Sequence, residues 1–187
     1  LYFKTVVGLE RLNEVLLQLF QERVINTQDD RPELLNDDFH ISRGYIEAID
    51  SNLFNRSPQA LLEVFLLCQQ NVQIKGISAK TIRLIQKNLH LIDDEFRAHK
   101  ESRHLFMEIL KQPEGTTHQL RRMNRYGLLA AYLPCFKNIV SRMQYDLFHI
   151  YTVDEHTLFV IRNLRRFALN KHNHEVPFCN DIFLLIP

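Results

Sequence analysis

The 187-residue chain contains no tryptophan, only 5 glycines and 6 prolines, and 3 cysteines. So few turn-forming residues favour long helices over a many-stranded β fold. Cys68, Cys135 and Cys179 are odd in number and form no C-x-x-C pair, which predicts free, buried thiols in a reducing compartment rather than a disulfide scaffold. No apolar run is long enough to cross a bilayer. These features predict a helical protein of the cytoplasm.

A clear excess of one charge is also missing. Lys and Arg number 23 and Asp and Glu 22, which gives a formal net charge of +1. A dedicated nucleic-acid-binding domain usually carries a basic excess, so this balance argues against nucleic acid as a partner. The chain begins without a methionine or a signal peptide, and its first residues already have a helical pattern. We therefore expect a piece of a longer protein.

Apolar residues at steps of three and four predict one long helix over residues 2–24. A polar, acidic segment that contains a proline follows, and residues 26–38 are expected to form a loop. Residues 39–50 alternate between apolar and polar on both sides of Arg43-Gly44, which predicts a short β-hairpin. This hairpin is the only strand-like signal in the sequence.

Start and stop signals place the remaining helices. Ser57 and Ser78 are expected N-caps, the first followed by Pro58 at the first helical position. Gly127 is an expected left-handed C-cap, and Thr152 opens a T-x-x-E capping box with Glu155. Helices are expected at 57–71, after Ser78, at 101–112, from Thr116 or Thr117 to Gly127, at 128–134 and from Thr152 to about Leu169. The predicted fold is mainly α, a helical bundle-like connector with one short β-hairpin near residues 39–50.

Six positions of the last helix share one face: His156, Phe159, Val160, Asn163, Leu164 and Phe167. A histidine on such an apolar stripe is usually a core residue, and metal ligation is the alternative. Asp154 and Glu155 are explained as first-turn acids that the helix dipole favours. His149 precedes His156 by seven residues, across a break in the helical pattern, so the pair defines no i, i+4 metal site.

Two further patterns have both a functional and a structural interpretation. The segment "HNHE" (172–175) could chelate a metal weakly, although a short histidine pair in a loop is more often exposed and inert. Arg121, Arg122 and Arg125 could contact phosphate, but the solvated face of a helix explains them better, and the same holds for "RNLRRF". The sequence has no Gly-rich phosphate loop, G-x-S-x-G or H-E-x-x-H. It therefore predicts no catalytic and no cofactor-binding residue in this chain.

The stretch "MQYDLFHIYTVDEHTL" (143–158), followed by "RNLRRFA", closely resembles the bacterial PII uridylyltransferase/uridylyl-removing enzyme family. The resemblance extends upstream through "ILKQPEGTTHQLRRMNRYGLLAAYLPCFKNIVSRM", "SNLFNRSPQALLEVFLLCQQNVQIKGISAKTIRLI" and "VVGLERLNEVLLQLF", and so covers essentially the whole chain. In that family a nucleotidyltransferase domain transfers UMP from UTP to a tyrosine of the PII protein. An HD phosphohydrolase domain removes the UMP, and ACT domains bind glutamine.

The resemblance implies that His156 matches the first metal ligand of an HD domain, which would hold Mg or Mn and activate a water. None of the nine histidines is followed by Asp, so the His-Asp doublet of that domain is missing. The signatures of the nucleotidyltransferase and ACT domains are missing too. The resemblance therefore implies a helical linker domain over residues 1–142 and the start of a truncated HD domain over 143–187. We expect no bound metal and no catalytic activity in this piece alone.

Three functions are compatible with the sequence. The first is a connector in the parent enzyme, whose PII, UTP and glutamine sites lie in absent domains. The second is the helical domain of an RNA nucleotidyltransferase, similar to a tRNA CCA-adding enzyme or a poly(A) polymerase, which the missing basic excess disfavours. The third is an interaction module that uses the acidic loop 26–38. The apolar face of the 153–169 helix should be exposed or covered by another copy, which predicts self-association.

Overall fold

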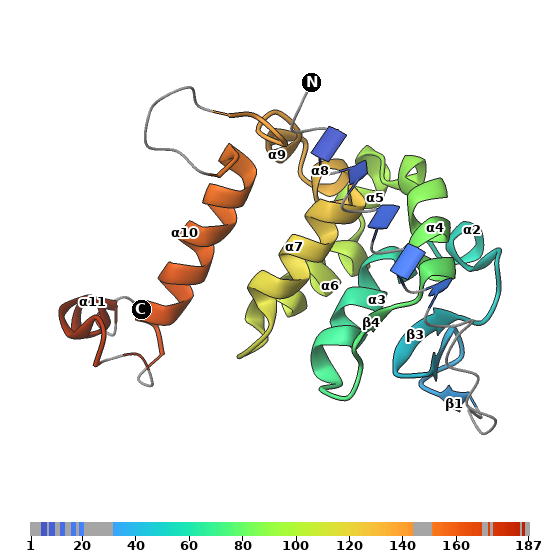
Figure 1. Ribbon diagram of the computed structural model, residues 1–187, viewed down its shortest axis with the longest axis horizontal. Coiled ribbons are helices and arrows are strands. Elements are labelled where there is room, and N and C mark those ends of the chain that lie inside the picture. The colour runs from blue at the N-terminus through green and yellow to red at the C-terminus, as the bar shows by residue number, and fades with distance from the viewer. Residues whose placement is uncertain are drawn as a thin grey trace. The chain divides into compact units, whose positions relative to one another are not determined.

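The computed structural model describes residues 32–143 and 151–169 continuously, together with scattered positions from 5 to 20 and most positions from 172 to 185. The chain divides into two compact units, residues 1–138 and 139–187. Helices dominate the described residues, and one small sheet accompanies them (Figure 1). The described positions from 5 to 20 are helical, and the rest of the helix predicted at 2–24 lies outside the described residues. The predicted mainly α fold with a short hairpin is confirmed.

The sheet contains the predicted hairpin and two strands that the sequence did not indicate. Its strands are β1 (Glu33–Leu34), β2 (Phe39–Ser42), β3 (Tyr45–Ala48) and β4 (Gly76–Ile77), in the spatial order β1-β2-β3-β4. Arg43 and Gly44, both with positive φ, form the hairpin turn. β1 is antiparallel to β2 and lies in the segment predicted as loop, while β4 is parallel to β3. Strands of two residues are too short to show a periodic pattern, so the sequence could not reveal them.

The sheet buries the side of the hairpin that carries its apolar residues. Phe39 lies opposite Ala48, and Ile41 lies opposite Ile46. All four are buried, whereas the residues that alternate with them are only half-buried, as expected for a strand covered on one face. Helices cover this face, since α4 (Ala79–Lys87) contacts β3 and α3 (Ala60–Gln70) contacts β4.

α3 is the central helix of the first unit and packs against both α6 and α7 (Figure 1). Most of its predicted apolar run, Leu61–Cys68, is buried, which confirms burial on more than one side. Between residues 32 and 138, which the structure describes continuously, the helices other than α3 and α4 are α2 (Leu53–Arg56), the 3-10 helix η1 (Leu89–Leu91), α5 (Asp94–Ala98), α6 (Lys100–Lys111), α7 (Thr116–Tyr126), α8 (Leu128–Tyr132) and α9 (Pro134–Lys137). The apolar core of the unit therefore surrounds α3.

The predicted caps are partly correct. Ser78 Oγ accepts a hydrogen bond from the backbone of Thr81, and Gly127 ends α7 with a φ of +87°, both as predicted. Ser57, by contrast, is the C-cap of α2, and its backbone N–H donates to the carbonyl of Leu53. α3 therefore starts at Ala60, later than predicted, because the preceding helix already uses Ser57.

The second unit contains α10 (Val153–Phe167) and α11 (Pro177–Phe183). Thr152 occupies the N-cap position of α10, as predicted, but its side chain makes no capping hydrogen bond, so the bond that the capping box predicts for this threonine is absent. The first turn is held by other contacts. The carboxylate of Asp154, only 3% exposed, accepts a hydrogen bond of 3.1 Å from the backbone of Ser141, and Val153 N donates to the carbonyl of Arg142 over 2.8 Å.

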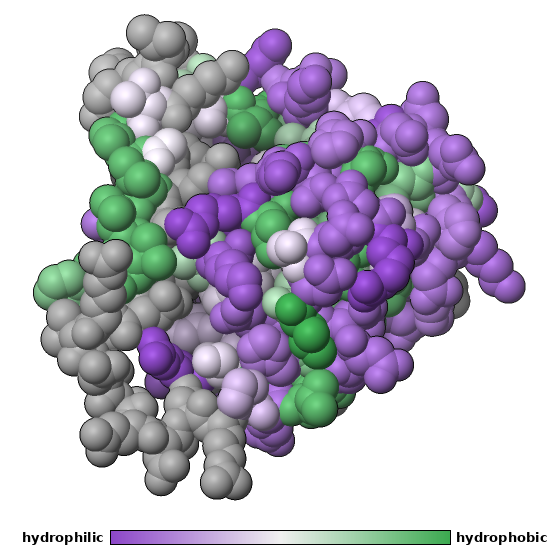
Figure 2. All heavy atoms as spheres, turned by 90° about the vertical axis from the view of Figure 1, so that its right-hand side faces the viewer, coloured by the Kyte–Doolittle hydropathy of each residue, from purple (hydrophilic) through white to green (hydrophobic). Residues whose placement is uncertain are grey.

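Hydrophilic residues cover most of the described surface in Figure 2, and hydrophobic residues form a strip along its left side and smaller groups elsewhere. Among the helices that the structure describes, none combines the length and the apolar character that crossing a membrane requires.

Candidate functional site

His156 lies in the second turn of α10 and is exposed, so the core-histidine interpretation is wrong for the described structure. The buried side chains of this helix are instead Asp154 and Leu158, one turn apart. These two residues mark the line of the helix that packs inward, and the helical period places the predicted stripe on the opposite face. The sequence pattern located the apolar stripe but not the side of the helix that its own unit buries.

The apolar stripe on α10 is largely uncovered in this chain, as predicted. Val160 and Leu164 are 45% and 44% exposed, and Phe159 and Phe167 are half-buried. α11 adds Phe178, which is 74% exposed. Exposed apolar side chains that gather on one element commonly mark an interaction surface.

The glutamate of the "HNHE" segment pairs with an arginine instead of joining the two histidines in a metal site. Arg166 forms an ion pair with the carboxylate of Glu175, and His172 Nδ1 lies 3.4 Å from the same carboxylate. The hydrogen bond from Arg166 is the main reason that the pKa of Glu175 falls below its usual value, and His172 adds to the effect. Within the described parts of the chain, no group of three His, Cys, Asp or Glu side chains could hold a metal ion. His149 lies outside those parts.

The basic run on α7 is a helix face, as predicted, but one of its arginines also makes a long-range contact. Its inner residues Leu120 and Met123 are buried, and so is Leu128, the first residue of α8. Arg122 is half-buried, and its Nη2 donates a hydrogen bond of 2.6 Å to the carbonyl of Lys75, just before β4. The solvated-face interpretation therefore describes this arginine incompletely.

The cysteines differ in their exposure. Cys68 on α3 is buried, and burial raises the pKa of its thiol to about 12, against the opposing effect of the Arg122 charge. It is therefore neutral and inert, as predicted. Cys135 is exposed, contrary to the prediction, because the short helix α9 buries Phe136 instead. Cys179 is half-buried.

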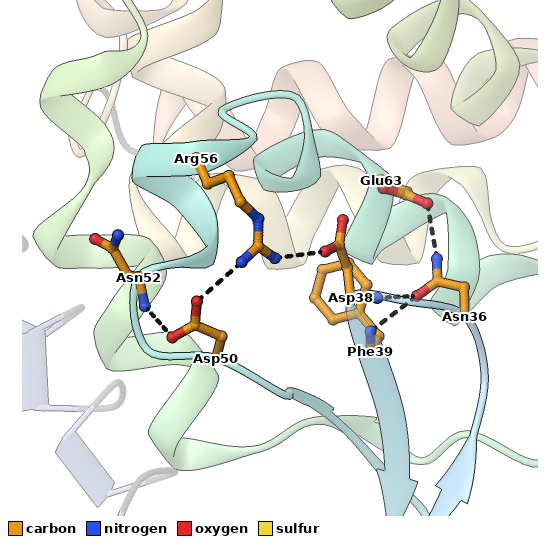
Figure 3. Close-up of polar contacts among 7 residues, drawn as sticks. All are labelled: Asn36, Asp38, Phe39, Asp50, Asn52, Arg56 and Glu63. Carbon is orange, nitrogen blue, oxygen red and sulfur yellow. Dashed lines mark hydrogen bonds and ion pairs between the residues drawn. The ribbon is translucent and has the colours of Figure 1, made fainter.

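A polar cluster that the sequence did not reveal joins the hairpin to α3 (Figure 3). Asn36 Oδ1 accepts hydrogen bonds from the backbones of Asp38 and Phe39, at 3.0 and 2.8 Å. Asn36 Nδ2 donates to Glu63 Oε1 on α3 over 2.9 Å. Burial, and then the charge of Asp38, raises the pKa of Glu63, which the bond from Asn36 opposes. The cluster fastens the turn between β1 and β2 to the central helix.

Arg56 completes this cluster by bridging two carboxylates. Its Nη2 lies 3.0 Å from Asp38 and its Nη1 lies 3.1 Å from Asp50, whose other oxygen accepts from the backbone of Asn52 at 2.9 Å (Figure 3). Arg56 and Asp50 are largely exposed, so each ion pair contributes little stability. These acids already bind an arginine or an amide, which is typical of a structural clamp rather than of a catalytic site.

Comparison with known proteins finds uridylyltransferases over the whole length of the chain. The family model described as the uridylyltransferase GlnD third domain matches residues 39–132. A bifunctional uridylyltransferase/uridylyl-removing enzyme of Methylococcus capsulatus is 59% identical over 99% of this chain and 21% of its own length. The proteins of that name from Nitrosococcus oceani and Pseudomonas syringae pv. tomato are 55% and 42% identical, over 97% and 100% of this chain and 20% and 21% of theirs. The chain thus spans about a fifth of the length of these curated relatives. No solved structure matches it.

Proposed function

Because the chain belongs to the family of bifunctional uridylyltransferase/uridylyl-removing enzymes, we propose that it serves as a catalytically inactive helical connector in such an enzyme. The complete enzyme transfers UMP from UTP to the PII protein and hydrolyses it again in response to glutamine. The binding sites for PII, UTP and glutamine then lie in other domains. The family match carries this proposal, and it disfavours the RNA nucleotidyltransferase alternative because the similarity to uridylyltransferases extends over the whole chain.

The connector comprises a linker domain, residues 1–142, and the start of an HD domain, residues 143–187. The division of the chain into compact units at 138 and 139 supports a boundary in this region. The first unit is built around a single buried helix and contains its own core, which suits a self-standing spacer. The second unit exposes apolar side chains on α10 and α11, which suits an element that packs against further parts of the enzyme.

His156 provides one ligand to a divalent metal, Mg or Mn, in the complete HD domain. Its exposure on α10 supports this role, because a ligand must reach an ion outside its own helix. A single histidine holds a metal only weakly, so further ligands must come from other parts of the enzyme. The bound ion would supply an activated water for hydrolysis of the UMP ester.

The test compares His156→Ala with His174→Ala in the complete enzyme. His174 is exposed and makes only a 3.8 Å contact with Glu175, so its loss removes an imidazole without disturbing packing. Mutating a residue that hydrogen-bonds to a metal ligand typically lowers activity about 10- to 100-fold. Loss of the ligand itself, in His156→Ala, should therefore reduce UMP removal by a larger factor. UMP transfer to PII, followed by mass spectrometry, should stay unchanged. Equal loss of both activities would count against the metal role.

The connector role has a separate test in the isolated chain. Incubated with PII, UTP and Mg or Mn, it should neither add nor remove UMP. Turnover that disappears in His156→Ala would show that the chain itself is catalytic.

A further inference from the structure

Positive charge is concentrated in two stretches of the first unit, although the net charge of the chain is close to zero. Residues 64–92 and residues 115–138 contain no Asp or Glu. These stretches include α4, α7 and the part of α3 that follows Glu63, and α7 contacts both of the other helices. Their basic residues are Lys75, Lys80, Arg83, Lys87, Arg121, Arg122, Arg125 and Lys137. Packing therefore brings two acid-free segments together, and the local potential is more positive than the composition indicates.

Arg122 lies at the centre of this arrangement. Its guanidinium is held over Gly76 at the start of β4, because a Cβ atom on that glycine would lie only 3.3 Å from Nη2. The ring of Tyr45, on the neighbouring strand, lies 3.7 Å from the same point. Tyr45 and Gly76 are paired in the sheet. The pairing of β3 with β4 therefore fixes the surface on which the guanidinium lies. The position of Arg122 is therefore built by three elements, α7, β3 and β4.

The same end of β4 holds a second cation. Arg122 bonds to the carbonyl of Lys75, whose aliphatic side chain lies against Gly44 in the hairpin turn. In the part of the chain that the structure describes, no carboxylate pairs with Arg122 or Lys75. By contrast, Lys80 nearby on α4 pairs with Glu47 at 2.6 Å.

The buried thiol of Cys68 does not supply the missing negative charge. The Arg122 charge acts on it, but burial raises the pKa of the thiol to about 12, so it stays protonated at neutral pH. Arg122 is half-buried as a residue, but the bond from its guanidinium to Lys75 is exposed to solvent. The guanidinium is therefore held in place by the sheet and still accessible to an external anion.

We propose that Arg122 and Lys75 form a binding site for a phosphate-bearing ligand above Gly76. A phosphate monoester carries about −1.5 to −2 charges at pH 7 and can neutralise both cations, whereas a carboxylate supplies only one charge. The planar fork of the guanidinium matches two phosphate oxygens, and the ammonium of Lys75 contributes a point charge. The site lies in the first unit, away in sequence from His156, and does not depend on the uridylyl chemistry of the parent enzyme.

The experiment is calorimetric titration of this chain with inorganic triphosphate at low salt. Arg122→Gln should weaken binding by roughly tenfold or more, because it removes charge-assisted hydrogen bonds, and Lys75→Gln should weaken it several-fold. Lys87→Gln is the matched control. Lys87 is an exposed lysine of the same acid-free stretch, so it removes the same charge away from Gly76. The affinity of Lys87→Gln for triphosphate should stay within about twofold of that of the parent chain, because Lys87 acts on the ligand only through a long-range charge interaction that salt screens.

Two outcomes would overturn the site. The first is that the parent chain does not bind triphosphate. The second is that Lys75→Gln and Lys87→Gln weaken binding equally, which would indicate a diffuse electrostatic attraction to the whole surface. Because Lys75 is exposed, that pair decides the question even if Arg122→Gln fails to fold. Tighter binding of a tetraglutamate peptide than of triphosphate would replace the phosphate ligand by an acidic protein segment. A parallel titration with UTP separates the two phosphate sources. Equal affinity indicates free oligophosphate, and tighter binding of UTP indicates a nucleotide whose base contacts Tyr45.

Discussion

Gln69 and Thr116 are 47 residues apart in the chain, and the side-chain amide of Gln69 donates a hydrogen bond of 3.1 Å to the hydroxyl of Thr116. The same nitrogen donates to the carbonyl of Glu114 over 2.8 Å. Thr116 Oγ1 also lies 3.2 Å from the carbonyl of Ile109, near the end of α6. One amide therefore fastens the end of α3 to the turn between α6 and α7.

Replacing this amide should destabilise the first unit. Gln69→Leu keeps much of the side-chain volume but leaves the carbonyl of Glu114 and the hydroxyl of Thr116 without their donor. We expect a loss of about 1–3 kcal/mol in the free energy of unfolding, measured by urea denaturation. Gln70→Leu, at the exposed neighbouring position, is the control and should change stability by less than about 0.5 kcal/mol. Equal effects of the two variants would exclude the amide as a fastener.

Two glycines should respond to alanine in opposite directions. Gly127 has a φ of +87°, and a Cβ there would lie 3.2 Å from a methyl group of Leu89, so Gly127→Ala should cost about 1–2 kcal/mol. Gly8 is helical and nothing lies within 4 Å of its added Cβ, so Gly8→Ala should stabilise the helix by about 0.5–1 kcal/mol. Thermal unfolding followed by circular dichroism measures both. A stabilising Gly127→Ala would contradict the left-handed cap.

Glu63 should make stability depend on pH. Its folded-state pKa is raised above 4.5 by burial and by the charge of Asp38, so the neutral form fits the fold better. This contribution is fully present below pH 4.5 and is lost as the pH rises through the folded pKa. Glu63→Gln keeps an acceptor for Asn36 and removes the charge. It should therefore raise stability at pH 7, by about 1 kcal/mol at most for a half-exposed group, and not at pH 4.

Urea denaturation of both proteins at pH 4 and pH 7 tests this dependence. Asp50→Asn is a suitable comparison, since it also removes an acid from the cluster but breaks an ion pair with Arg56. A Glu63→Gln variant that is less stable than the parent chain at pH 7 would show that the hydrogen bond from Asn36 needs the ionised carboxylate.

The exposed face of α10 should make the isolated chain self-associate. Its Val160 and Leu164, with Phe178 and Ile182 of α11, present apolar side chains to solvent. Sedimentation equilibrium should give an average mass that rises with concentration. The double variant Val160→Ser/Leu164→Ser should shift this towards the monomer, whereas Asn163→Ser, also exposed on α10, should not. A strictly monomeric parent chain at every concentration would exclude this surface as a self-association site.

Local chemistry explains what the sequence could predict about the fold. The side chain of Ser78 and the backbone freedom of Gly127 act within one helical turn, so both caps were predictable. β1, β4 and α2 depend on neighbours rather than on their own pattern. β4, for example, has only two residues, and it exists because β3 presents unpaired backbone groups beside it.

The candidate sites show the same limit. The stripe on α10 was visible as a period, but Asp154 and Leu158 decide which side of the helix its own unit buries. The bond from Asn36 to Glu63 joins residues 27 apart, and that from Arg122 to Lys75 joins residues 47 apart. No spacing rule relates such pairs, so the clamp of Figure 3 and the cation over Gly76 emerge only from the folded chain.

The parallel pairing of β4 with β3 has a consequence for the order of folding. β2 and β3 close over a two-residue turn, and such hairpins form within about 1–10 μs. β4 can join only after the intervening chain, which contains α2 and α3, has returned to the same edge, and contacts between distant residues are slow to form. The surface under Arg122, formed by Tyr45 and Gly76, is therefore completed late, once α3 has packed against the rest of the unit. Any change that slows the packing of α3 would leave a formed hairpin that lacks β4.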